Sequence, residues 1–141
     1  MDLETIQDMW SRDSVVDDVM LDQASLKIPQ LHSKYITLYN EFSLLNKKAI
    51  QELRKLEHKK SLYYSGKAAP EEYEDSPFHY KVLKSDVPHW VGVDDDVMKV
   101  QMKLDYYSAT LRCLEDILKQ VHQMSYTISN VIKWRTFVNG V

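Results

Sequence analysis

The chain has 141 residues, a length that fits a single domain. Its 18 Lys and Arg against 21 Asp and Glu give a net charge of −3. Three Gly and four Pro argue against a turn-rich β sandwich or barrel, and no apolar run is long enough to span a membrane. Gly66, Gly92 and Gly140 each stand alone, which excludes a glycine-rich phosphate loop, and Cys113 has no second thiol for an intrachain disulfide. We therefore expect an all-α protein of the reducing cytoplasm that is not an enzyme.

The N-terminal 25 residues are acidic, and the first long helix follows them. Residues 1–25 carry seven acids against Arg12, a net charge of −6. They can add a short helix, with a break between Ser25 and Pro29. Pro29 suits a first helical turn, so we expect a helix from about Pro29 to Tyr64, with Gly66 available for a left-handed cap. Its apolar stripe comprises Leu31, Tyr35, Leu38, Phe42, Leu45, Ala49, Leu53, Leu56 and Tyr63.

The second half of this helix is strongly basic. Residues 47–67 carry seven Lys and Arg against two Glu, a net charge of +5. At about 100° per residue, the cations share one face away from the apolar stripe, except that Lys60 falls on the core side. Repeated cations match the phosphates of a single strand and Tyr rings can stack on bases, although a lysine-rich helix face is more often simply solvated. The candidate nucleic-acid-binding residues are Lys47, Lys48, Arg54, Lys55, His58, Lys59, Lys60, Tyr63, Tyr64 and Lys67.

Residues 65–94 are the expected connector. They contain three of the four prolines and the only plausible strand, His79–Lys84. We expect an ordered loop with at most one short extended piece. Its aromatic side chains, above all Phe78 and Trp90, can form a protein-docking loop or pack the connector onto its own helices.

A second long helix is expected over residues 95–138. Asp94, Asp95 and Asp96 can cap its N-terminus and oppose the helix dipole. Five heptads follow with one polar interruption, Ser125, and flanking apolar residues widen the apolar face beyond a two-stranded seam. The candidate oligomerisation residues are Val97, Val100, Leu104, Tyr107, Leu111, Leu114, Leu118, Val121, Ile128 and Ile132.

The predicted helix lengths raise the question of assembly. At about 1.5 Å per residue the two helices span roughly 54 and 66 Å, more than the roughly 37 Å diameter of a compact monomer. The apolar stripes are then buried by sister chains, or the last helix folds back near Ser125 into a small monomeric bundle. We favour a homo-oligomeric helical bundle. Residues 1–94 would carry the acidic segment, the basic helix and the connector, and residues 95–141 would drive oligomerisation.

No constellation for catalysis or metal binding is apparent. His32, His58, His79, His89 and His122 share no metal-ligand spacing, and no nucleophile motif occurs. We therefore expect no catalytic residue, no metal and no cofactor.

Two short motifs carry a family resemblance. Leu62-Tyr63-Tyr64-Ser65-Gly66-Lys67, directly after the basic helix, resembles the box that ends the basic run in the UvsY family of recombination mediators from T-even-like phages. A second match is Asp96-Val97-Met98-Lys99-Val100 at the start of the C-terminal helix. The length and the order of the parts agree over essentially the whole chain.

The resemblance implies a small helical protein that forms a hexameric or heptameric ring and hydrolyses nothing. It implies binding to single-stranded DNA, and contacts with a UvsX-type recombinase and the phage single-strand-binding protein, in the cytoplasm of an infected bacterial host. The DNA-contacting basic residues of the family correspond to His58 and Lys60, and its assembly region to the heptads at 97–132. From the residues alone, a coiled-coil scaffold or adaptor without nucleic-acid binding and an RNA-binding regulator stay open as alternatives.

Overall fold

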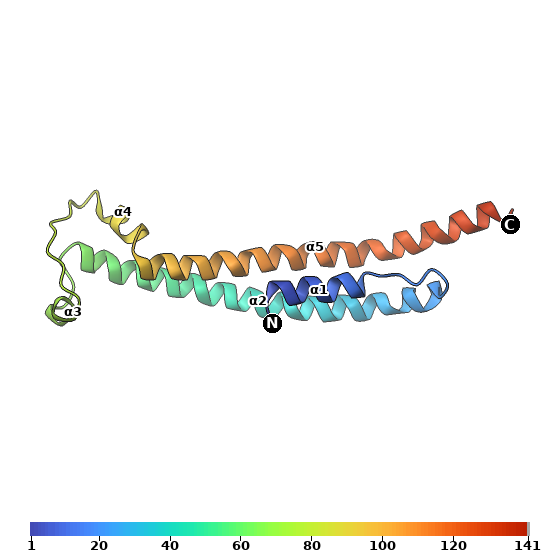
Figure 1. Cartoon of the computed structure of the whole chain (residues 1–141), viewed down its shortest axis with the longest axis horizontal. Helices are drawn as coiled ribbons and strands as arrows, with labels where there is room; N and C mark the ends of the chain where they lie inside the picture. Colours follow the sequence, from blue (N-terminus) through green and yellow to red (C-terminus); the bar gives the residue numbers. More distant parts are fainter. Residues whose placement is uncertain (141) are drawn as a thin grey trace. The chain divides into compact units, whose positions relative to one another are not determined.

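The computed structural model describes residues 1–140 (Figure 1). Within this range the chain has no β-strand, and its helices are α1 (Leu3–Asp13), α2 (Leu21–Tyr64), α3 (Pro70–Asp75), α4 (Val87–Gly92) and α5 (Asp95–Val138). This confirms the all-α prediction, the short N-terminal helix and the long helix over 95–138. No described helix combines the length and the apolar character needed to cross a membrane.

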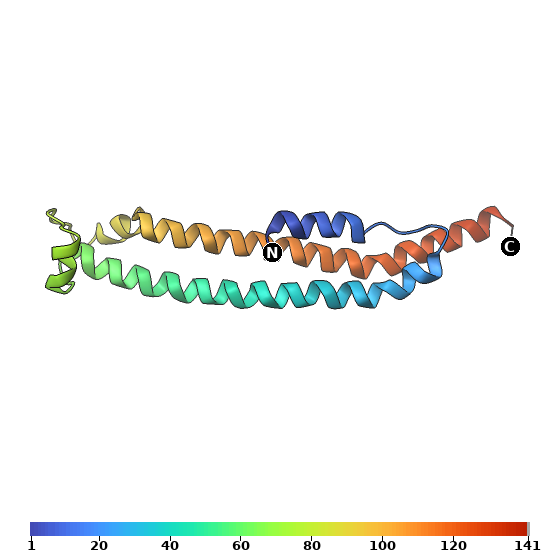
Figure 2. The same cartoon turned by 60° about the horizontal axis from the view of Figure 1, so that its bottom comes forward.

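The chain divides into two compact units. Unit 1 comprises Met1–Ser43 and Ala109–Val141, and so holds α1, the first part of α2 and most of α5. Unit 2 comprises Leu44–Ser108, and so holds the basic part of α2, the connector and the beginning of α5. Within each unit the α2 and α5 segments run antiparallel and side by side (Figure 2).

Unit 1 has a core to which three helices contribute. Ile6 of α1, Tyr35 of α2 and Leu114 of α5 are each completely buried. The Trp10 ring of α1 meets the Tyr35 ring edge-on, with centroids 5.5 Å apart. At the end of α1, the Asp13 carboxylate accepts hydrogen bonds from Tyr35 Oη and Lys34 Nζ, at 2.8 and 2.6 Å. The acidic N-terminal segment is therefore part of the packed fold.

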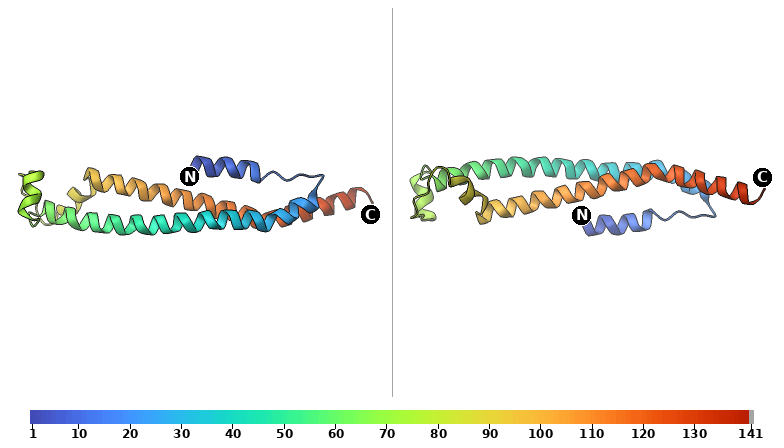
Figure 3. Two further views of the ribbon diagram at one scale, coloured as in Figure 1. Left: turned by 90° about the horizontal axis from the view of Figure 1, so that it is seen from below. Right: turned by 90° about the horizontal axis from the view of Figure 1, so that it is seen from above.

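The expected break before Pro29 is wrong. Helix α2 begins at Leu21 and continues through Pro29. Proline removes one backbone hydrogen bond, to the carbonyl of Ser25, but Ser25 and Pro29 are both exposed, so water can satisfy that carbonyl. The helix bends near this end instead of stopping (Figure 3).

Helix α5 is continuous, so the predicted alternative of a fold-back near Ser125 is wrong. Its most buried column also differs from the predicted heptad stripe. In unit 1 that column comprises Thr110, Leu114, Ile117, Val121, Met124 and Ile128. Ile117 and Met124 are buried in place of Leu118 and Ser125. Two apolar columns run side by side on α5, and the helices packed against it in unit 1 cover the column that contains Ile117 and Met124. Ser125 is exposed and interrupts nothing.

The other predicted stripe residues of α5 differ widely in burial. Val97, Leu114, Val121 and Ile128 are buried, whereas Ile132 is half exposed. The partly buried members are Val100, Leu104, Tyr107, Leu111 and Leu118. The expectation that these stripes depend on sister chains for burial is therefore wrong in part, because the chain's own helices cover much of them.

The connector in unit 2 is more helical than expected. The short helices α3 and α4 each have a proline in the first turn, Pro70 and Pro88, where a missing N–H costs no hydrogen bond. Val87 and Val91 of α4 pack with Leu53 and Val97 in the core of this unit. Residues 77–83 form neither helix nor strand and residues 84–86 form a turn, so the strand predicted at His79–Lys84 is absent.

Candidate nucleic-acid interface

The exposed face of α2 in unit 2 carries six of the candidate basic residues. We call it the basic face, and its members are Lys47, Lys48, Arg54, Lys55, His58 and Lys59, all of which are exposed. Ala49 and Leu53, on the opposite side of the same helix, are buried. The sequence-based division of α2 into a core side and a basic side is therefore confirmed.

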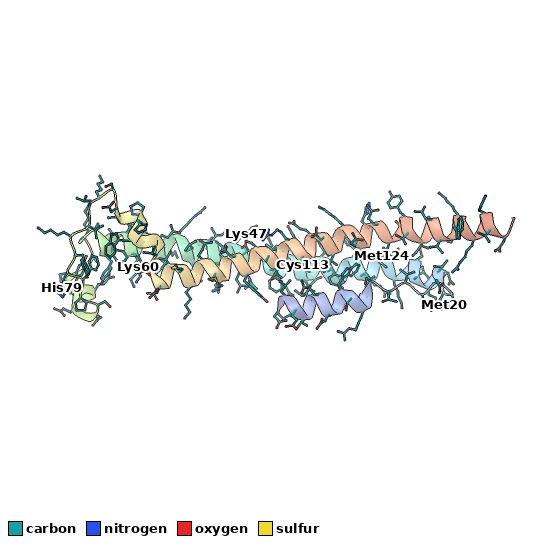
Figure 4. All side chains as sticks on the ribbon, turned by 45° about the horizontal axis from the view of Figure 1, so that its top comes forward. Met20, Lys47, Lys60, His79, Cys113 and Met124 are labelled. Atoms are coloured by element: carbon teal, nitrogen blue, oxygen red, sulfur yellow. The ribbon has the colours of Figure 1, made fainter. Side chains whose placement is uncertain are left out.

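The basic face is electrostatically available. Among the ion pairs of residues 1–140, none uses any of its six side chains. From Lys47 to Lys59 it extends about 18 Å along the helix axis. Because the cations stand on a rigid helix, a strand that binds along it meets several positive charges at once. Figure 4 labels Lys47 at the beginning of this stretch.

Lys60 occupies a different environment from the basic face. Its side chain is only 20% exposed, and its Nζ lies 2.9 Å from Asp96 Oδ2 and 3.3 Å from Asp94 Oδ2 (Figure 4). Both carboxylates belong to the N-terminal end of α5. Lys60, which helical periodicity places on the core side of α2, thus links α2 to the N-terminal end of α5.

Asp94 is the centre of this junction. Its Oδ1 accepts the backbone N–H groups of Asp96 and Val97, at 2.9 and 3.2 Å, and so caps α5. Its Oδ2 accepts a 2.6 Å hydrogen bond from Tyr64 Oη. One buried carboxylate therefore joins the C-terminal end of α2 to the N-terminal end of α5.

The pKa values of the junction follow from these contacts. Burial by itself would raise the pKa of Asp94, but the Tyr64 and Val97 hydrogen bonds and the Lys60 charge outweigh it and lower that pKa. Burial would lower the pKa of Lys60, but the hydrogen bond to Asp96 and the charge of Asp94 raise it. Burial and the hydrogen bond to Asp94 both raise the pKa of Tyr64. At neutral pH the junction therefore contains a direct ion pair of Lys60 and Asp94, with the neutral Tyr64 phenol donating to the same carboxylate.

The two candidate tyrosines lie inside an aromatic cluster of unit 2. The Tyr63 ring stacks on Tyr73 of α3, with centroids 5.3 Å apart, and its hydroxyl donates to the carbonyl of Ser76. The Tyr64 ring meets Phe78 edge-on at 5.2 Å. Phe78 and Trp90 also touch each other, at 5.6 Å. Of the two interpretations of the aromatic connector, the structure supports packing onto its own helices.

The turn after the basic face is closed by a glycine. Gly66 has φ of +79°, and the N–H groups of Gly66 and Lys67 donate to the carbonyls of Tyr63 and Leu62, at 3.3 and 2.9 Å. This is a Schellman arrangement, which confirms the predicted left-handed cap. It leaves Lys67 exposed just beyond the end of α2.

The partners of two candidate residues, Lys60 and Tyr64, are not apparent from the sequence. Helical periodicity places Lys60 on the core side of α2 and Asp94 at a cap, but no pattern joins these two positions, which lie 34 residues apart. Nor does any pattern bring Tyr73 and Tyr80 to the part of unit 2 that Tyr64 lines. The density of aromatic residues over 73–90 is the signal that could have found this cluster. Among the described residues, no group of three or more His, Cys, Asp or Glu is placed to hold a metal.

Comparison with known proteins identifies the family. The family model described as "Recombination, repair and ssDNA binding protein UvsY" matches residues 9–141. The chain belongs to the UvsY family. It is 26% identical to recombination protein uvsY of Enterobacteria phage T4 over 143 residues, which cover 99% of both chains.

Solved structures of a UvsY protein have the same fold. A crystal structure of the bacteriophage T4 recombination mediator protein UvsY is similar with a TM-score of 0.86 and 20% identity, covering 99% of this chain and 98% of that one. A second crystal form gives a TM-score of 0.82 with 97% and 98% covered.

Membership of the UvsY family decides between the functions that the sequence left open. This UvsY chain is a recombination and repair protein that binds single-stranded DNA, and is not a scaffold without nucleic-acid binding. The basic face of α2 is the feature of the structure that suits such a ligand.

Proposed function

We propose that this protein mediates recombination by holding single-stranded DNA along the basic face of α2. The observation that supports this most is the row of five exposed Lys and Arg side chains with His58 among them, none of which is engaged in an ion pair within the described chain. Phosphate contacts of this kind are independent of sequence, as a mediator requires. We assign His58 to this face. Lys60 is assigned instead to the junction with Asp94 and Asp96, in place of the direct contact that the family resemblance implies.

The mechanism that we propose is not catalytic. A strand bent or extended along several basic faces would lose complementarity to a bound single-strand-binding protein and would be presented to a UvsX-type recombinase. Several protomers on one strand multiply a weak site by valency. These events would take place in the cytoplasm of the infected bacterial host.

A homo-oligomeric ring would supply that valency. The last turns of α5 carry large apolar side chains that unit 1 leaves mostly exposed: Trp134 is 64%, Phe137 76% and Val138 60% exposed. Apolar area of this kind at the end of a helix favours contact with another copy of the chain. A hexamer or heptamer built through α5 is consistent with this exposure.

The decisive experiment is fluorescence anisotropy of a labelled oligo-dT strand, titrated with salt. The test variant carries Lys47→Glu, Lys55→Glu and Lys59→Glu. The matched control carries Arg12→Glu, Lys27→Glu and Lys119→Glu, all three exposed in unit 1 and away from the last turns of α5. Both variants change the charge by the same amount, so bulk repulsion is equal.

We expect the test variant to lose at least roughly 10-fold in affinity and the slope of log K against log salt to fall by about 0.7 for each lost phosphate contact. The control should lose much less, and sedimentation should give wild-type oligomers for both. Equal losses in the two variants, or unchanged affinity in the test variant, would contradict the assignment of the basic face.

A further inference from the structure

Beyond the basic face, unit 2 contains a hollow with aromatic walls. Its volume is about 530 Å³, within the range of small-molecule sites, and we call it the aromatic hollow. The end of α2 supplies Tyr64, and the connector supplies Tyr73, Phe78 and Tyr80. Gly66 also lines the hollow, and a side chain at its position would meet nothing within 4 Å, so this wall is open.

Tyr80 is a large aromatic ring held in place but left open to solvent. It is 71% exposed. Its ring centroid lies 5.7 Å from that of Phe78 and 5.7 Å from that of Trp90, which fix it from one side. An exposed ring that is already immobilised can stack on a flat partner at little further entropic cost. Figure 4 shows side chains crowded around the labelled His79, the residue before Tyr80.

The charge around the hollow favours an anionic ligand. Among the described residues that line it, Lys81 is charged and none is acidic. A neighbouring hollow, on the Tyr63 side, is lined by Glu72, Asp75 and Asp94 together with Lys59 and Lys60, so its carboxylates compete with a phosphate for those two cations. The aromatic hollow therefore combines a flat apolar ring, a cation and the absence of carboxylates, as a nucleotide requires.

The hollow also lies where the basic face ends. Ser65, on its wall, follows Lys59 by six residues, which corresponds to about 9 Å along the helix axis. Exposed Lys67 follows directly after the turn. A strand whose phosphates follow the basic face can thus continue toward the hollow, where Lys67 and Lys81 supply the next positive charges.

We propose that the aromatic hollow receives one unstacked base of the bound single strand, with that base stacked on Tyr80 and its phosphate beside Lys81. This inference rests on the proposed role of the basic face and adds to it a contact with the base. Stacking is tolerant of sequence, because every base has a flat aromatic face. If each protomer holds one unstacked base in this way, the distance between hollows would set the length of strand bound per protomer.

The test compares two strands of equal length and equal phosphate number, one oligo-dT and one composed of abasic tetrahydrofuran sites. Both are titrated against the full-length protein by anisotropy at several salt concentrations. The variants are Tyr80→Ala, Tyr80→Phe and, as a matched control, Tyr126→Ala, which removes a 59% exposed tyrosine from α5 in unit 1. Circular dichroism and sedimentation check that each variant keeps its helices and its oligomer.

We expect the wild-type protein to bind oligo-dT roughly 10-fold more tightly than the abasic strand. Tyr80→Ala should abolish that preference while binding the abasic strand with an unchanged salt slope, and Tyr80→Phe and Tyr126→Ala should keep it. Equal binding of the two strands by the wild-type protein, or a full preference in Tyr80→Ala, would overturn the base contact and leave the basic face standing. If the wild-type protein bound neither strand in a salt-dependent way, that result would overturn the two proposals together.

Discussion

Replacing Asp94 by alanine tests whether one carboxylate holds α2 and α5 together at their junction. The change removes the cap of α5, which is worth about 1 kcal/mol. It also leaves Tyr64 Oη without its charged acceptor at 2.6 Å, a loss of about 2 kcal/mol for a partly buried hydrogen bond. We therefore expect the free energy of unfolding to fall by about 3 kcal/mol, and the melting temperature by about 9 °C for a domain of this size.

The assay is urea unfolding followed by far-ultraviolet circular dichroism at a fixed protomer concentration, because assembly would otherwise shift the midpoint. The matched control is Asp95→Ala, which removes the same charge from an exposed position one residue along. That control should lose no more than about 0.5 kcal/mol through the helix dipole. Asp94→Ala should also be strongly non-additive with Tyr64→Phe. A difference below about 0.5 kcal/mol between Asp94→Ala and Asp95→Ala would refute the reasoning.

The same carboxylate predicts a pH dependence. The folded-state pKa of Asp94 lies below its ordinary value of 3.8, so the unfolded chain binds this proton more readily. The stability that Asp94 contributes is therefore fully present above about pH 5 and is lost as the pH falls through its folded-state pKa. Comparing wild type with Asp94→Ala at neutral pH and at about pH 3 should show the gap in unfolding free energy narrowing in acid. A gap that widens in acid would contradict the sign of this shift.

Two further predictions concern packing and backbone conformation. Met124→Ala should lower the free energy of unfolding by about 2 kcal/mol, since Met124 is 9% exposed, whereas Ser125→Ala should change it by less than about 0.5 kcal/mol. Urea unfolding measures both changes. A larger loss for Ser125→Ala than for Met124→Ala would indicate that the predicted heptad column, and not the one that contains Met124, is buried. Gly66→Ala should cost about 1 kcal/mol, because φ is +79° there, and Gly92→Ala at the end of α4 should be neutral or stabilising by about 0.5 kcal/mol. Thermal melts of the two glycine variants separate the cost of backbone strain from the effect of reduced chain flexibility. Equal changes in melting temperature for Gly66→Ala and Gly92→Ala would contradict the left-handed cap.

The features that the sequence predicted well are local or strongly periodic. The end of α2 at Tyr64, the cap at Gly66 and the division of α2 into basic and buried sides all depend on residues within a few turns of one another. Helix propensity and the period of the apolar residues determine such features before any tertiary contact forms. The exposure of the basic face followed directly from this division.

The features that the sequence did not predict depend on neighbours. Pro29 interrupts one hydrogen bond on an exposed side of α2, so a helix held by unit 1 continues through it. On α5, Leu118 and Ile117 are equally apolar, and only the positions of α1 and α2 select Ile117 for the core. The pairing of Lys60 with Asp94 joins two helices across the connector, and no sequence pattern marks it.

The antiparallel pairing of α2 and α5 has a consequence for the order in which the chain folds. Contacts next to the connector join residues that are close in sequence, as in Lys60–Asp96 with a separation of 36, whereas Asp18–Arg135 in unit 1 closes a loop of 117 residues. The difference in loop-closure entropy is about 1 kcal/mol in favour of the connector end. We therefore expect pairing to begin beside the connector. The segment of α2 that carries the basic face is consequently expected to pair with α5 first.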